Sequence, residues 1–375
     1  MLTRFYANNY RTLVAFEIRF DSMAVFCGAN GTGKSSMFDA IKFVRDLATG
    51  RCFLDGFIDE RKNTISSLDF TYWMKSSIQE FEVEFDLDGQ QFEYIIHLEQ
   101  AVSKEPRIIK EIARCGDKEL LSRDLSGVSF GNRSGFPLDW SQAALPTIRA
   151  VNEACAEIGL LQLAFDNLVI LQPNVMAFEQ ESKQESRFPN HNFSNLTSWY
   201  RYLAQDLDFT DALRESLQEI WPDDFRSLKL NDAGISAKWL GLRFQGVEQL
   251  RFDQLSDGEK MLICLYMIHA ALSVGNMNTV MIDEPDNFVS LQELQPWLLS
   301  ISELVDKNHQ VLIISHNTEI LESNPSSSVL FWRDNHCSPT RIGSAIIPEG
   351  LAISEALARG WVMGGKTTSR VKENA

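Results

Sequence analysis

Residues Gly28 to Ser35 have the sequence Gly-Ala-Asn-Gly-Thr-Gly-Lys-Ser, and this stretch decides the fold. It matches the phosphate-binding pattern Gly-x-x-x-x-Gly-Lys-[Ser/Thr] at every fixed position. A short apolar run, Met23 to Cys27, precedes it, and apolar residues recur behind it at helical spacing as far as Ala48. Since a functional phosphate loop joins a strand to a helix, this context favours a nucleotide-binding site over a chance glycine-rich turn.

Each residue type in the loop suits phosphate chemistry. The glycines let the backbone wrap closely around phosphate with its N–H groups pointing inward. Lys34 would bring a fixed positive charge to the β- and γ-phosphates of ATP, and Ser35 would offer its hydroxyl to Mg²⁺. We expect nucleotide contacts from Gly28, Ala29, Asn30, Gly31, Thr32, Gly33, Lys34, Ser35 and Ser36.

Two later apolar runs also end in polar side chains. Val280 to Ile282 is followed by Asp283 and Glu284, and Leu312 to Ile314 is followed by Ser315 and His316. Ligands of open α/β sheets bind at the carboxyl ends of such buried strands. We expect Asp283 to orient Mg²⁺ and its waters, and Glu284 to act as the general base toward the attacking water. Alone, either run would also fit a strand that ends in a solvated turn, but the upstream phosphate loop favours catalysis.

The segment Leu255-Ser256-Asp257-Gly258-Glu259 resembles the signature sequence of ATP-binding-cassette (ABC) ATPases. The phosphate loop, this segment, Asp283–Glu284 and His316 follow one another in the order of that family. In ABC ATPases the signature closes on the γ-phosphate bound by a second subunit. The resemblance therefore implies an ATP-dependent head-to-tail homodimer or higher oligomer, with Ser256 and Gly258 facing the partner's nucleotide. Asp257 and Glu259 depart from the usual glycine and glutamine, and an N-capped helix without a ligand is the alternative.

The same resemblance assigns three further roles. His316 matches the switch histidine, which contacts the γ-phosphate, so we expect Glu284, His316 and Lys34 to be catalytic. Gln172, in Leu171-Gln172-Pro173, is similar to the glutamine that contacts Mg²⁺. Arg11, in Asn9-Tyr10-Arg11, resembles the Asn-x-Arg element of RecF-like and SMC-like heads, which implies a nucleotide contact; a surface arginine on a turn is the alternative.

The order of the predicted elements indicates an α/β fold, and the resemblance implies an ABC-type P-loop ATPase head. We expect a mixed or parallel core sheet, an antiparallel N-terminal β subdomain and a helical insert. Apolar alternation on both sides of Asp88-Gly89 predicts a β-hairpin. The predicted lobes are an N-terminal ATPase lobe over 1–140, a helical insert or lid over 141–225 and a C-terminal ATPase lobe over 226–375. Within the insert we expect helices over 150–163 and 199–220, and a polar loop over 180–195 that is either mobile or a docking segment.

Composition and charge narrow the range of functions. The chain carries 35 Lys and Arg against 51 Asp and Glu, a net charge of −16. Such an acidic chain is not a generic polyanion binder, because phosphate contacts need clustered Lys and Arg. The six cysteines include no Cys-x-x-Cys pair, so neither a zinc site nor a disulfide framework is indicated. The longest apolar stretch, Met261 to Val274, is too short to span a bilayer, and no signal peptide is evident, so we expect a cytoplasmic protein without a membrane partner.

The residues after Glu284-Pro285 indicate a branch of the family. Asp286 to Ser290 is more similar to the Asp-Glu-Pro-Glu-Asn-x-Leu-His pattern of bacterial RecF-like AAA/ABC ATPases than to transporter subunits, although Ser290 replaces the histidine. No long coiled coil is inserted, and too little chain follows His316 for a Toprim nuclease domain. The chain thus resembles stand-alone ATPases of bacterial antiphage systems, in which a separate nuclease or toxin is the effector. Two alternatives stay open: a DNA repair or recombination ATPase that clamps DNA, which the acidic balance disfavours, and a slow nucleotide-dependent scaffold.

Overall fold

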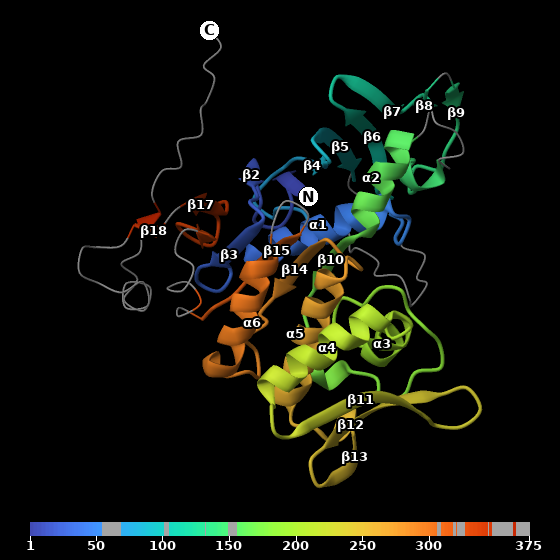
Figure 1. Cartoon of the computed structure of the whole chain (residues 1–375). Helices are drawn as coiled ribbons and strands as arrows, with labels where there is room; N and C mark the ends of the chain where they lie inside the picture. The colour runs from blue at the N-terminus through green and yellow to red at the C-terminus, as the bar shows by residue number, and fades with distance from the viewer. Residues whose placement is uncertain are drawn as a thin grey trace. The chain divides into compact units, whose positions relative to one another are not determined.

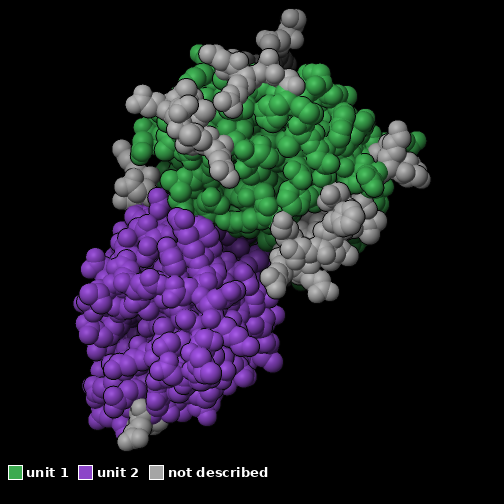
Figure 2. All heavy atoms as spheres, turned by 90° about the vertical axis from the view of Figure 1, so that its right-hand side faces the viewer, with its two compact units in different colours: residues 1–168, 320–375 green, residues 169–319 purple. Residues whose placement is uncertain are grey.

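The computed structural model divides the chain into two compact units (Figure 2). Unit 1 contains Met1–Leu168 and Ile320–Ala375, and unit 2 is the continuous segment Val169–Glu319. The residues that the structure describes are 1–54, 69–100, 105–131, 133–148, 156–305, 309–317, 320, 327–343, 345–346 and 363–364.

Unit 1 consists mainly of strands and has two described α-helices (Figure 1). Its elements are β1 (Leu2–Asn8), β2 (Phe16–Arg19), β3 (Met23–Cys27), α1 (Lys34–Ala48), β4 (Ile78–Leu87), β5 (Gln90–Glu99), β6 (Arg107–Cys115), β7 (Lys118–Asp124), β8 (Gly127–Phe130), β9 (Arg133–Phe136), the 3₁₀ helix η1 (Leu145–Thr147), α2 (Ala156–Asp166), β16 (Ser328–Trp332), β17 (Arg341–Gly343), β18 (Ala345–Ile346) and β19 (Met363–Gly364).

An eight-stranded antiparallel sheet in the order β2-β1-β4-β5-β6-β7-β8-β9 forms most of unit 1. The predicted hairpin is present: β4 pairs with β5 from Ile78↔Glu99 to Leu87↔Gln90, and Asp88 and Gly89 both take positive φ at the turn. Phe81, Val83 and Phe85 are buried on one face of β4 while the glutamates between them face outward. This two-residue period gives the sheet one dry and one wet face.

Helices α1 and α2 pack on the dry face of this sheet through aromatic side chains. Phe43 of α1 meets Phe81 edge to face with ring centres 5.6 Å apart. Phe165 of α2 meets Phe85 at 5.0 Å and Tyr94 at 5.2 Å. Each such pair adds about 0.5–1.5 kcal/mol to the burial of its rings, so α1, which begins at the phosphate loop, is anchored firmly to the sheet.

The strand that leads into the phosphate loop belongs to a different sheet. β3 pairs in parallel with β16, with Val25 opposite Ser328 and Cys27 opposite Leu330. β17 then pairs antiparallel with β16. Every residue of β3 is buried, as expected for a strand covered on both faces.

Unit 2 combines helices with two groups of strands (Figure 1). Its elements are β10 (Leu168–Leu171, of which Leu168 belongs to unit 1), the 3₁₀ helix η3 (Val175–Ala177), α3 (Leu196–Leu203), α4 (Leu207–Ile220), β11 (Phe225–Asp232), β12 (Lys238–Phe244), β13 (Val247–Arg251), the 3₁₀ helix η4 (Phe252–Gln254), α5 (Asp257–Ser273), β14 (Thr279–Asp283), α6 (Leu291–Leu304) and β15 (Gln310–Ile314).

The core of unit 2 surrounds two fully buried parallel strands. β14 and β15 pair from Thr279↔Gln310 to Asp283↔Ile314, and β10 lies on the other side of β14. Helix α5 is apolar around most of its circumference, and the Trp297 indole of α6 donates to the Leu265 carbonyl at 2.9 Å. β11, β12 and β13 form a separate three-stranded antiparallel sheet. The predicted strands over 279–283 and 310–315 are therefore present, with Asp283 at the carboxyl end of the first.

The predicted helix over 199–220 is wrong as one element, because it is two helices. Asp206 separates α3 from α4, and its side chain accepts a hydrogen bond from the Asp208 N–H, as an N-cap does. The predicted helix over 150–163 corresponds to α2, and its first part lies outside the described residues. The segment 180–195 is a loop as predicted, tied internally by bonds from the Asn195 amide to Ser186 and Phe188 and by the fully buried Phe193 ring.

Within the described part of the chain, no helix has the length and apolar character required to cross a bilayer.

Candidate nucleotide-binding site

The phosphate loop of unit 1 joins β3 to α1, and its three glycines all take φ values that favour glycine. Gly28, Gly31 and Gly33 have φ of +142°, +76° and +104°. A Cβ on Gly28 would lie 2.2 Å from the Phe331 carbonyl oxygen, and one on Gly33 would lie 2.2 Å from the Thr340 hydroxyl. Both the backbone angle and the space therefore restrict these two positions to glycine.

The loop presents hydrogen-bond donors that the described protein does not use. The main-chain N–H groups of Asn30, Gly31 and Gly33 donate to no acceptor within the described ranges. Helix α1 begins directly after them, with no side-chain cap at Gly33 and no acidic residue in its first turn. Unused N–H groups at the positive end of a helix dipole form an anion site, so this geometry suits phosphate.

Lys34 brings its charge to the same place. Its side chain is buried, and Nζ donates to the Gly28 and Ala29 carbonyls at 2.8 and 3.1 Å. The ammonium group therefore lies over the loop. A buried ammonium has lost much of its hydration, which strengthens its attraction for an anion.

A chain of hydroxyls holds the loop from behind, and sequence analysis missed it. Thr340 Oγ1 donates to the Thr32 carbonyl at 2.9 Å and lies 2.8 Å from Thr12 Oγ1. Arg333, just after β16, donates to the Gly31 carbonyl at 3.0 Å. These residues lie far from the loop in the sequence and belong to no motif, so no sequence pattern would have revealed them.

Arg11 lies beside α1 in unit 1. Its guanidinium bonds to Asp39 on that helix and to Asp69 at 3.2 Å, and its φ is +46°. Arg11 lies in a turn with its side chain 37% exposed, so the alternative of a surface arginine on a turn stays open. Its contact with nucleotide stays a prediction.

In unit 2 the structure brings Asp283 and Gln172 together. Asp283 ends β14 and is 4% exposed, and the Gln172 amide nitrogen lies 3.4 Å from Asp283 Oδ2. Across the described ranges, no group of three or more His, Cys, Asp or Glu residues could hold a metal ion. Mg²⁺ needs no such group, because it binds through one or two oxygen ligands, waters and the phosphates of its substrate. A carboxylate and an amide supply oxygen donors of the kind that Mg²⁺ takes, so Asp283 and Gln172 fit the ion. The contact of the Ser35 hydroxyl with Mg²⁺ stays a prediction.

Glu284 is held in place by three contacts. Its N–H donates to the Ile314 carbonyl at 2.9 Å, its Oε2 accepts from Asn287 at 2.8 Å, and its Oε1 lies 3.3 Å from His316 Nε2. Its φ of +55° is unusual for a residue with a side chain, and such strain is common at functional sites. The structure thus unites the predicted base with the predicted switch histidine.

Asp286 is a further participant that sequence analysis did not assign. Burial raises the pKa of its carboxyl above the usual value, and its side chain is hydrogen-bonded to Ser315. The Ser315 hydroxyl in turn accepts from the Asn317 N–H at 2.9 Å. Asp286 therefore braces the turn that carries His316.

The predicted signature residues form the start of α5. Ser256 is its N-cap and forms a capping box with Glu259: the Ser256 hydroxyl and N–H lie 2.7 and 2.8 Å from Glu259 Oε2. Asp257 bonds to Lys260 at 3.1 Å, and a Cβ on Gly258 would lie 2.9 Å from the Phe288 carbonyl. In this structure Ser256 thus serves the helix as a cap, and its contact with a second copy's nucleotide stays a prediction.

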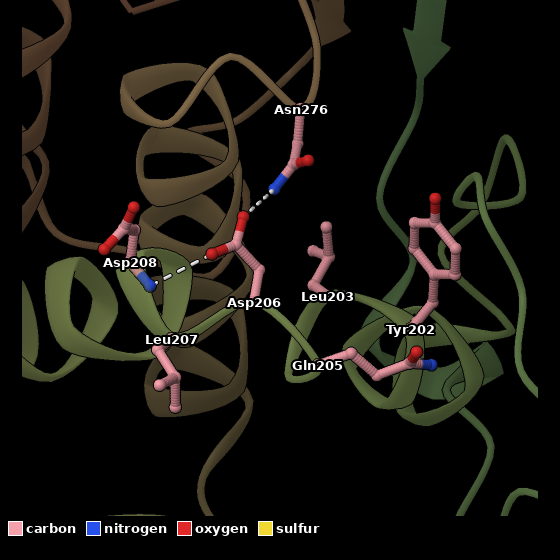
Figure 3. Close-up of a pocket in the computed structure, with 7 residues that line it drawn as sticks. All are labelled: Tyr202, Leu203, Gln205, Asp206, Leu207, Asp208 and Asn276. Atoms are coloured by element: carbon pink, nitrogen blue, oxygen red, sulfur yellow. Dashed lines mark hydrogen bonds between the residues drawn. The ribbon is translucent and has the colours of Figure 1, made fainter.

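A cavity of about 520 Å³ in unit 2 lies where α3 meets α4 (Figure 3). Asp206 accepts from the Asn276 amide there at 3.5 Å. Its walls bear two carboxylates and no basic side chain, so it does not suit phosphate. The lining residues are Tyr202, Leu203, Gln205, Asp206, Leu207, Asp208 and Asn276.

A glycine-rich loop between a strand and a helix, and an acidic pair at the end of a buried strand, define a P-loop nucleotide-binding protein. Comparison with known proteins gives the family. The model of the family described as "RecF/RecN/SMC N terminal domain" matches residues 1–338. The chain therefore belongs to this family of ABC-type ATPases. No curated protein matches the chain.

Solved structures show the same fold. One is an SmcHead bound to the C-winged helix domain of ScpA, with 15% identity, coverage of 92% of this chain and 98% of that one, and a TM-score of 0.57. Another is an Smc head domain with an extended coiled coil bound to the C-terminal domain of ScpA derived from Pyrococcus furiosus, with 13% identity, coverage of 96% and 98%, and a TM-score of 0.55. The predicted α/β ABC-type head is thereby confirmed.

Proposed function

We propose that this chain binds ATP with Mg²⁺ and hydrolyses it to ADP and phosphate. The observation that carries the proposal is the phosphate loop, whose unused N–H groups and buried Lys34 meet at the uncapped start of α1. Membership of an ABC-type ATPase family supports it. Phosphate is the ligand that this combination of donors and charge fits best.

Each residue then has a role in hydrolysis. Lys34 turns from the loop carbonyls to the β- and γ-phosphates. By analogy with the family, Ser35, Asp283 and Gln172 would offer oxygen ligands to Mg²⁺, which would neutralise developing phosphate charge. Glu284 orients and deprotonates the attacking water, because its carboxylate is already fixed by Asn287 and His316.

We propose further that two copies associate head to tail when ATP is bound. Ser256 and Gly258 of one copy would then approach the γ-phosphate on the other. The support is family membership and the position of Ser256 at the N-terminus of a 17-residue helix, where the dipole favours an anion. In this state the Ser256 hydroxyl gives up its hydrogen bond to Glu259 and donates to the phosphate instead.

The ATP-bound dimer would control a separate effector, a nuclease or a toxin, in bacterial antiphage defence. Heads of this fold bind other proteins in solved structures, since both structures described above hold a domain of ScpA. A partner protein is therefore consistent with the fold. A DNA-clamping repair ATPase is the alternative that a binding experiment must separate.

Phosphate release in steady state tests the enzymatic part. Glu284→Gln keeps size and hydrogen bonding but removes the base, so hydrolysis should fall about 10²- to 10⁴-fold. Glu215→Gln, an exposed glutamate on α4 of the same unit, is the matched control and should leave the rate unchanged. Equal rates in wild type and Glu284→Gln would remove Glu284 as the base.

Light scattering tests the assembly. The 42.6 kDa chain carrying Glu284→Gln should double its mass on ATP, and Lys34→Ala should not. A Glu284→Gln protein that binds ATP but stays monomeric would contradict the trans role of Ser256.

A pull-down tests the partner. Tagged Glu284→Gln protein, recovered from its host in the presence of ATP, should carry the product of a neighbouring gene and no DNA. Bound DNA together with recombination proteins would favour the repair alternative.

A further inference from the structure

A tight turn follows Glu284 in unit 2 and brings Asn287 back onto it. The main-chain N–H of Asn287 donates to the Glu284 carbonyl at 3.2 Å, and Pro285 occupies the second position of this turn, which its fixed φ suits. The Asn287 side-chain amide also donates to Glu284 Oε2 at 2.8 Å. Two hydrogen bonds thus join the same pair of residues, one through the backbone and one through the side chains.

The side-chain bond orients a carboxylate that packing alone does not fix. The terminal torsion of a glutamate has broad minima, and the Glu284 side chain is 34% exposed. Its other oxygen, Oε1, lies 3.3 Å from His316 Nε2. A carboxylate oxygen has two lone pairs, so Oε1 can still accept a hydrogen bond from a water molecule beside it.

The two side-chain contacts of Glu284 differ in what nucleotide would do to them. His316 is expected to contact the γ-phosphate of bound ATP, which draws its imidazole away from the carboxylate. The bond from Asn287 closes within one turn of the chain and needs no nucleotide. Of the two contacts described here, the one from Asn287 is therefore the one that would orient Glu284 throughout hydrolysis.

We propose that Asn287 is a positioning residue for hydrolysis, which aims the Glu284 carboxylate at the attacking water. The proposal rests on the proposed function, in which Glu284 is the general base. One proton of the water passes to Glu284 while the water oxygen bonds to the γ-phosphorus and the bond from that phosphorus to ADP breaks. A base must lie within hydrogen-bond reach of the proton it takes, and a small misplacement lowers the rate strongly.

A different explanation is that the Asn287 side chain only stabilises the turn. The two explanations make different predictions for a site that has lost its base. Loss of a turn-stabilising group lowers the residual rate of Glu284→Gln as well, because the distorted turn remains. Loss of a positioning group costs nothing further there, because no base is left to orient. A double-mutant cycle therefore separates them.

The experiment measures kcat and KM by phosphate release, and ATP affinity by calorimetry, on the full chain. Asn287→Ala and the nearly isosteric Asn287→Asp remove the amide donor and keep the backbone bond. In both, kcat should fall about 10- to 100-fold while KM and ATP affinity stay unchanged. Asn276→Ala is the matched control, since Asn276 is an exposed asparagine of the same unit that also donates to a carboxylate, and it should change none of these values.

Single-turnover hydrolysis of radiolabelled ATP completes the cycle, because it can follow slow variants. Adding Asn287→Ala to Glu284→Gln should leave the residual rate unchanged. A further loss as large as in the wild-type background, an unchanged kcat in Asn287→Ala, or a fall in ATP affinity in both Asn287 variants would overturn the positioning role. Equal rates in wild type and Glu284→Gln would refute the proposed function itself, whereas a loss in Glu284→Gln without one in Asn287→Ala would refute this inference alone.

Discussion

Thr340→Val tests whether the hydroxyl chain behind the phosphate loop prepares it for nucleotide. Thr340 Oγ1 carries one proton and gives it to the Thr32 carbonyl at 2.9 Å. The 2.8 Å contact with Thr12 must then be a bond donated by the Thr12 hydroxyl. Valine has nearly the shape of threonine and removes both bonds, so the change is electrostatic rather than steric. Thr340 is 5% exposed, and water cannot easily replace the lost partner.

The expected size follows from these two bonds. A typical intramolecular hydrogen bond contributes about 1 kcal/mol, and a buried carbonyl left without its donor costs about 1–3 kcal/mol. A total near 2 kcal/mol corresponds to about a 30-fold change in an equilibrium, at about 1.4 kcal/mol per factor of ten. If the bonds hold the loop in its binding conformation, ATP affinity should fall by up to this factor.

Calorimetric titration of ATP into wild type, Thr340→Val and Thr340→Ser measures the effect. Serine keeps the hydroxyl and should bind close to wild type. Unchanged ATP affinity in Thr340→Val would show that the loop keeps its conformation without the two hydrogen bonds of the Thr340 hydroxyl. An equal loss in both variants would assign the effect to the methyl group and its packing, and would refute the hydrogen-bond argument.

Two further predictions concern single buried groups. Burial raises the pKa of Cys27 to about 11. At pH 8 iodoacetamide should therefore label the exposed Cys337 well before Cys27, which mass spectrometry can follow. Equal labelling of the two thiols would contradict the burial of strand β3. Burial lowers the pKa of His269 below its usual 6.5, so protons bind the unfolded chain preferentially and stability should fall as pH drops from about 6.5 toward the folded pKa. His269→Gln should reduce the difference between urea midpoints at pH 7.5 and 5.5, and an unchanged difference would exclude His269 as a source of that pH dependence.

The parts of this protein that could be predicted are those marked by patterns of residues close together in the sequence. The phosphate loop, the hairpin at Asp88-Gly89 and the apolar runs before Asp283 and Ser315 are local patterns, and each marks an element that the structure contains. The carboxyl ends of parallel strands share one sheet edge, which is why Glu284 and His316 could be expected to meet. They lie 3.3 Å apart across the ends of β14 and β15.

The remainder depended on contacts that no local pattern encodes. Thr340 contacts Thr32 across 308 positions of sequence, and Arg333 contacts Gly31 across 302. A threonine or arginine in a loop has no distinctive spacing, so such supports are invisible before the chain folds. The break between α3 and α4 was missed for another reason: Asp206 is a capping residue inside a continuous helical pattern, and its capping bond decides the boundary.

The acidity of unit 2 bears on how the proposed dimer would close. Val169 to Glu319 contains 22 Asp and Glu against 11 Lys and Arg, and Glu259 already occupies the Ser256 hydroxyl. A polyphosphate that approaches α5 is therefore repelled by the surrounding negative charge. It also finds the Ser256 hydroxyl already hydrogen-bonded to Glu259. The helix dipole alone contributes about 0.3–1 kcal/mol, too little to offset such repulsion. Closure of the dimer should accordingly require a nucleotide whose charge has already been neutralised by Lys34 and Mg²⁺ of the other copy. The signature segment at the start of α5 would then respond to a fully assembled ATP site and not to free nucleotide.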